Sequence, residues 1–162
     1  MRLFLTTLLL FSSASGVGSE ECSCTKAGDG VTTRGGSWQV PTTEKKVLKT
    51  IRGEVLFSKD HPLDDVLVEV FDNPDALLDL FRPCPDGENC PNSRDLPKKQ
   101  KRLAACMTGE EGEFCFPDLP PGRYEVRFSK DYFEKSFLIV TLAPEHPRSS
   151  SKRLKVFLQA GV

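Results

Sequence analysis

The chain has few of the residues that catalysis and metal binding most often need. It contains two histidines, one tryptophan, two tyrosines and two methionines among 162 residues. Both histidines, His61 and His146, precede a proline, which favours a loop. No Gly-x-Ser-x-Gly elbow, His-Glu-x-x-His pair or glycine-rich phosphate loop is present. We therefore predict that the protein is not an enzyme and has no cofactor and no metal site.

The chain also lacks an excess of charge and any long apolar run. Its 22 Lys and Arg balance 23 Asp and Glu, so we expect no nucleic-acid partner. Residues 3–11 are apolar, follow Arg2 and precede the small residues of 12–18, a layout typical of a secretory signal peptide. We expect removal of residues 1–18 and a secreted or periplasmic chain. We expect no membrane span, because no segment reaches about 18 uninterrupted apolar residues.

Cysteine is present in an even number, and every cysteine follows the leader. The six are Cys22, Cys24, Cys84, Cys90, Cys106 and Cys115. An even count in an exported chain favours disulfides. The absence of a Cys-x-x-Cys pair, with both histidines distant, argues against zinc.

One pairing has a geometric argument. If residues 109–112 form a hairpin loop, Cys106 lies directly opposite Cys115, within reach of a disulfide. Cys84 and Cys90 flank a turn at Pro85-Asp86-Gly87, which favours a local bridge. Cys22 and Cys24 remain open: they pair with each other, with a second copy, or with the cysteines at 84 and 90.

Alternation of apolar and polar residues dominates the rest of the chain. Residues 19–44 are polar and read as a flexible arm, followed by a domain over 45–162. Alternating segments include 47–57, 65–71 and the hairpin 103–117. Three more follow, at 122–128, 136–142 and 153–159. About seven strands with Pro and Gly corners predict an all-β protein, a seven-stranded antiparallel β-sandwich. The expected core includes Val66, Val68, Val70, Phe114, Phe116, Tyr124, Val126 and Phe128.

Residues 73–102 depart from this pattern and read as an insertion between two strands. Asn73 and Pro74 predict the start of a short helix over 74–81, and a basic cluster closes the segment. The candidate interaction surface consists of Leu77, Leu78, Phe81, Lys98, Lys99, Lys101 and Arg102. The alternative is that the apolar members pack on the sandwich and the basic ones are solvated.

A family resemblance rests on the run T-x-x-x-G-x-F-x-F-x-x-L-P-P-G-x-Y-x-V at residues 108–126. Together with Ile51-x-Gly53-x-Val55 and the segment 62–70, it resembles the carboxypeptidase regulatory-like domain over roughly residues 47–160. The resemblance implies a transthyretin-like (prealbumin-like) sandwich of seven strands. The chain departs from the family in its insertion and in Gly109, where the family has an aspartate.

The expected function is that of an exported, non-catalytic module for protein interaction or structure, with an envelope or extracellular protein as partner. The alternative is carbohydrate binding to a polysaccharide of the cell envelope, with Trp38 and Tyr132 as the aromatic platforms. A third alternative is a transthyretin-like hydrolase. Its C-terminal Tyr-Arg-Gly-Ser motif is missing, because the sequence ends Gln159-Ala160-Gly161-Val162.

Overall fold

The computed structural model describes residues 24–34, 36–39, 46–59, 61–83 and 99–161. Four predicted features lie outside these ranges: the signal peptide, the local bridge between Cys84 and Cys90, Cys22, and Lys98. The described chain is mostly strand, with very little helix. No helix in these ranges has the length and hydropathy needed to cross a bilayer.

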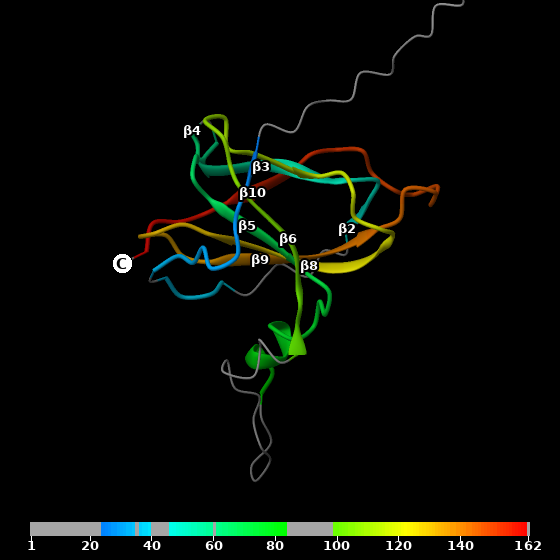
Figure 1. The fold of residues 1–162 in the computed structure, drawn as a ribbon, viewed down its shortest axis with the longest axis horizontal. Helices are drawn as coiled ribbons and strands as arrows, with labels where there is room; N and C mark the ends of the chain where they lie inside the picture. The colour runs from blue at the N-terminus through cyan, green and yellow to red at the C-terminus, as the bar shows by residue number, and fades with distance from the viewer. Residues whose placement is uncertain (1–23, 35, 40–45, 60, 84–98, 162) are drawn as a thin grey trace, which may run out of the picture.

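Six strands form the larger sheet (Figure 1). In order across the sheet they are β1 (Thr25–Lys26), β6 (Arg102–Met107), β5 (Leu67–Phe71), β8 (Gly122–Ser129), β9 (Ser136–Leu142) and β2 (Lys46–Leu48). Neighbours are antiparallel from β1 to β9, whereas β2 runs parallel to β9. The sheet is therefore mixed.

The smaller sheet is built around β3 (Ile51–Ser58), which pairs on one side with β10 (Leu154–Phe157). On its other side β3 pairs with β7 (Glu113–Phe116) and β4 (His61–Pro62). β10 is parallel to β3. Within the described ranges there are thus ten strands, two pairs of which are parallel, where seven antiparallel strands were expected. Alternation reports which face a residue occupies, but it does not report the direction in which a short edge strand joins its neighbour.

Residues of both sheets contribute to one buried core. The predicted inward sets are confirmed: Val66, Val68, Val70, Phe114, Phe116, Tyr124, Val126 and Phe128 are all buried. Phe57, near the end of β3, interrupts the alternation of that strand, because its side chain is 50% exposed while the neighbouring Leu56 is buried. The register of β3 against β4 shifts between Leu56 and Ser58, and such a bulge reverses the alternation.

The expected hairpin at 103–117 is wrong, because its two strands belong to different sheets. β6 pairs with β5, so that Cys106 lies opposite Val68, whereas β7 pairs with β3, so that Cys115 lies opposite Arg52. The connection between them is fixed by Thr108, whose Oγ1 accepts the Val66 N–H at 3.0 Å. A hairpin loop and a crossing between sheets use the same glycine-rich sequence, so the local pattern did not separate them.

The part of the insertion expected to form a helix, residues 74–81, contains less helix than expected. Residues 74–77 form turns, and only η1 (Leu78–Phe81) is a 3₁₀ helix. Asn73 does not cap it, since its side-chain amide donates to the Lys99 carbonyl at 3.1 Å and so ties the two ends of the insertion together. Figure 1 shows η1 beyond the end of β5 and beside the start of β6.

Candidate ligand-binding site

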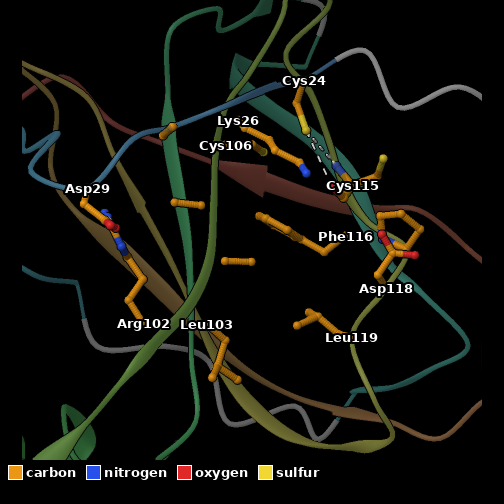
Figure 2. A pocket seen from close by; sticks show the side chains of 14 residues that line it. Cys24, Lys26, Asp29, Arg102, Leu103, Cys106, Cys115, Phe116, Asp118 and Leu119 are labelled. Carbon is orange, nitrogen blue, oxygen red and sulfur yellow. Dashed lines mark hydrogen bonds and ion pairs between the residues drawn. The ribbon is translucent and has the colours of Figure 1, made fainter.

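A cavity of about 550 Å³ opens between β6 and the segment that follows β7. Its walls come from residues 24–29, 102–106 and 115–119, and we call it the edge cavity. Figure 2 shows Leu103 and Leu119 near one end and the sulfur of Cys24 at the other. The cavity therefore lies at the β6 side of the molecule and is lined by three separate stretches of chain.

A β-bulge places Leu103 at this cavity. The pairing of β5 with β6 shifts register between Val70 and Phe71, so that Leu103 has no direct partner on β5. Such a bulge bends the strand and redirects the side chain. Leu103 lines the cavity and is 40% exposed. The local break in the ladder thus provides an accessible apolar group.

The floor of the edge cavity is apolar and its rim is charged. Phe116 is buried, and Ala104 and Leu119 pack against the core. On the rim, Arg102 donates to Asp29 at 2.7 Å and to Glu69 at 3.1 Å. Hydrogen bonds to these two carboxylates raise the pKa of the Arg102 guanidinium. Arg102, predicted to be part of a basic interaction cluster, instead ties the turn at residues 28–29 to β6.

Three cysteines gather at one end of the edge cavity. The sulfur of Cys24 accepts the Cys115 N–H at 3.5 Å and lies 3.6 Å from the Cys115 carbonyl oxygen. The Cys24 side chain also forms a hydrogen bond with that of Cys106. Cys115 takes part in a disulfide, but neither Cys24 nor Cys106 is its partner, because both carry free thiols. The predicted bridge between Cys106 and Cys115 is therefore wrong, since β6 and β7 do not pair as a hairpin.

A second cavity, of about 650 Å³, lies beside the turn between β8 and β9. We call it the Tyr132 cavity. Its lining residues are Arg34, Gly36, Ser37, Asp131, Tyr132, Glu134 and Gly161. Tyr132 is 86% exposed and has a φ of 69°, a left-handed conformation that is uncommon outside glycine. The Arg34 N–H donates to Asp131 at 2.6 Å. This hydrogen bond connects the described part of the expected arm to the turn, and both residues line the cavity.

The two predicted sugar-binding aromatics do not lie together. Trp38 is half-buried and packs edge-on against Phe137, with the ring centroids 6.1 Å apart. Lys135 and Arg127 approach its ring at 5.8 Å and 5.6 Å. Trp38 is not among the residues that line the Tyr132 cavity. Of the two predicted residues, Tyr132 alone combines high exposure with an adjoining cavity.

The apolar part of the predicted interaction surface packs on the protein itself. Leu77 is fully buried, Leu78 is half-buried, and Phe81 stacks on Phe137 with ring centroids 6.0 Å apart. Lys99 and Lys101 are exposed. The predicted surface is therefore divided, with its apolar residues directed at the larger sheet and its two described lysines in solvent.

Sequence analysis missed a buried ionic group under this insertion. Glu125 on β8 has no exposed surface. Its carboxylate accepts from the Arg127 guanidinium at 2.6 Å and from the Gln100 amide at 3.0 Å, and Arg127 also donates to Gln100. Burial raises the pKa of Glu125, while hydrogen bonds from Arg127 and Gln100 offset part of that rise. The available signal was the alternation of Glu125 and Arg127 with core residues on a central strand.

Comparison with known proteins does not add to this description. No family model matches the chain, and no curated protein and no solved structure matches it either.

Proposed function

We propose that the chain is an exported, non-catalytic β-sandwich of the carboxypeptidase regulatory-like type, with a transthyretin-like antiparallel core, that binds another protein. The leader sequence supports export. The run at residues 108–126 and its buried aromatic side chains support the family. The scarcity of catalytic residue patterns supports a binding role.

The edge cavity is the observation that carries this proposal. Its size lies in the range of about 300–1,000 Å³ typical of ligand sites, which combine an apolar lining with a few polar groups. Phe116 and Leu119 supply the floor, and Lys26 and Asp118 supply charge at the sides. The occupant that fits is an apolar side chain carried by an extended segment of a partner protein.

The neighbouring sheet edge supports an extended partner rather than a small molecule. β1 pairs with β6 only at Met107 and Cys106, with one further hydrogen bond from Ala27 to Ala105. Within the described ranges, residues 102–104 have no strand on that side. An edge of this kind offers backbone donors and acceptors to an added strand. The partner's backbone would lie along β6 while its side chain enters the cavity beside Leu103.

A capture experiment with matched variants tests this function. The oxidised mature chain, residues 19–162, is immobilised and exposed to an envelope extract, and bound proteins are quantified by mass spectrometry. Leu103→Asp places a charge at the mouth of the cavity and should reduce capture of the specific partner at least about tenfold, because a buried unpaired charge is costly. Tyr132→Ala, on the other cavity, should leave capture unchanged. Equal capture by wild type and Leu103→Asp would contradict the proposal.

The Tyr132 cavity supports a second candidate function, carbohydrate binding. An exposed aromatic ring stacks on the apolar face of a sugar, and the adjoining Arg34, Asp131 and Glu134 offer groups that hydrogen-bond to hydroxyls. Affinity electrophoresis in gels containing envelope polysaccharide tests it. Retardation that is lost in Tyr132→Ala and kept in Leu103→Asp would establish this function, and unretarded migration of the wild type would exclude it for the polysaccharide used.

A further inference from the structure

Cys24 and Cys106 occupy neighbouring positions on one side of a strand pair. In the antiparallel pairing of β1 with β6, Lys26 lies opposite Cys106. Cys24 precedes Lys26 by two residues, and residues two apart on an extended chain point to the same side. Cys24 is thus the diagonal neighbour of Cys106, and the two side chains are close enough to form a hydrogen bond. Both thiols line the edge cavity (Figure 2).

The two thiols differ in the way that an attacking and a resolving cysteine differ. Cys24 is half-buried, and hydrogen bonds from Cys106 and from the Cys115 N–H lower the pKa of its thiol to about 6. Cys106 is buried, and donation to Cys24 together with burial raises the pKa of its thiol. The thiolate is the reactive form of cysteine. At neutral pH the accessible sulfur is therefore the nucleophile, and the buried one stays protonated beside it.

We propose that Cys24 and Cys106 form a reactive cysteine pair that exchanges with disulfides in the surrounding medium and closes into an intramolecular bridge between β1 and β6. This pair is distinct from the disulfide that Cys115 forms, and it stands on the geometry of the strand pair whether or not a partner protein binds in the edge cavity.

The reaction proceeds in two exchanges. The Cys24 thiolate attacks one sulfur of a small disulfide RSSR; a new S–S bond forms between Cys24 and that sulfur, the S–S bond of RSSR breaks, and the other sulfur leaves as RS⁻. Cys106 then loses its proton, which RS⁻ accepts, and attacks the Cys24 sulfur. The mixed disulfide breaks, and the second RS⁻ takes a proton from water. Two cysteines are oxidised, and one RSSR is reduced to two RSH.

Closure would fasten a strand that is otherwise weakly held. β1 contains two residues and pairs with β6 at two positions. A disulfide at Cys24, the residue that precedes β1, would link β1 covalently to β6 and so fix one wall of the edge cavity. The open and closed forms therefore differ at the cavity wall while the core between the sheets is unchanged.

Peptide mapping of the mature chain tests the proposal. The protein, isolated with its native disulfide intact and its free thiols reduced, is incubated in buffers of glutathione and glutathione disulfide. It is then alkylated at acid pH and digested without reduction. A peptide that joins Cys24 to Cys106, increasing in amount with the share of glutathione disulfide, is the expected product. A bridge between Cys24 and Cys115, or no bridge at Cys24 while glutathione is present as disulfide, would overturn the assignment.

Two variants separate the roles of the cysteines. Cys106→Ser should stop after the first exchange and accumulate a glutathione adduct on Cys24. Cys24→Ser should leave Cys106 without an adduct under native conditions, because its sulfur is buried. Adduct formation at Cys106 in Cys24→Ser, at a rate equal to that of Cys24 in Cys106→Ser, would contradict the division of roles. Circular dichroism of both variants controls for folding, and the wild-type map decides the proposal if either variant unfolds.

The pH dependence of alkylation gives a readout that a structural cysteine would not share. The rate at which iodoacetamide modifies Cys24 should decrease as pH is lowered through about 6. In Cys106→Ala the midpoint should move to higher pH, because the donor to the Cys24 sulfur is removed. A midpoint near that of an ordinary cysteine in the wild type would show that Cys106 does not activate Cys24.

Discussion

The two faces of strand β8 are both buried, but by different means. Val126 and Phe128 point to the core and have no exposed surface. Glu125, on the opposite face, has none either, and Arg127 is 9% exposed. The inner face is covered by apolar side chains of the other sheet, whereas the outer face is covered by ends of the insertion and the arm. A charged residue on a central strand thus marked a polar contact with another part of the chain and not solvent.

The outer face depends on matched polar groups, and the inner face on packing. The Gln100 amide donates a hydrogen bond to the Glu125 carboxylate, and the Arg127 guanidinium lies 4.0 Å from the ring centroid of Phe71. Removing one member of such a buried ion pair leaves a charge without compensation, whereas replacing both members by apolar residues is often neutral. Substitutions on the two faces of β8 should therefore follow different rules.

Truncation on the inner face should have the largest effect. Phe128→Ala removes a fully buried ring that packs edge-on against Phe114, with centroids 5.3 Å apart. Large aromatic truncations in a core cost about 3–5 kcal/mol of the free energy of unfolding. Urea denaturation followed by tryptophan fluorescence measures this loss of unfolding free energy. A loss below about 1 kcal/mol would show that the core closes over the missing ring.

Removal of one charge on the outer face should have the next largest effect. Arg127→Leu leaves Glu125 buried without its cation, and we expect a loss of about 3 kcal/mol at pH 7. The double variant Glu125→Leu with Arg127→Leu should recover most of that loss. This recovery has no counterpart on the inner face, so a double variant as unstable as Arg127→Leu would mean that the outer face is held by packing alone.

The pH dependence of stability should also distinguish the two faces. Burial raises the pKa of Glu125 above its ordinary 4.5. A carboxyl with a raised folded-state pKa stabilises the fold fully below its unfolded pKa and loses that contribution as pH rises through its folded pKa. As pH rises, the unfolding free energy of wild type should therefore fall relative to that of Glu125→Gln. An identical pH profile for both proteins would contradict the assignment.

Loss of a single neutral hydrogen bond should have the smallest effect. The Tyr124 hydroxyl donates to the Pro120 carbonyl at 2.6 Å, from the inner face of β8 to the Pro-Pro-Gly corner. Tyr124→Phe keeps the ring and removes this bond, so we expect a loss of about 1 kcal/mol. Thermal unfolding by calorimetry measures the change. A loss as large as that of Phe128→Ala would show that the corner, and not the packed face, limits stability.

Sequence analysis predicted which residues are buried better than how the strands connect. Val66, Val68 and Val70 were placed correctly because alternation depends only on the strand and the two environments at its faces. The crossing between β6 and β7 was not predictable, because residues 108–112 have the composition of a hairpin and the choice of sheet depends on distant chain. The bulge at Leu103, which helps to form the edge cavity, arises from a register shift between β5 and β6. The sequence of one strand alone does not predict such a shift.

The parallel pairing of β10 with β3 joins two segments that lie far apart in the sequence. β10 pairs with residues 53–56 of β3 through residues 154–157, so this part of the β3 edge stays unpaired until residues 154–157 have been synthesised. An unpaired edge is a template for association with other chains, and pairings between residues far apart in sequence form slowly. This edge of β3 is therefore open to association with other chains until β10 joins it. Variants that lack β10 should precipitate, although every described strand of the larger sheet is present.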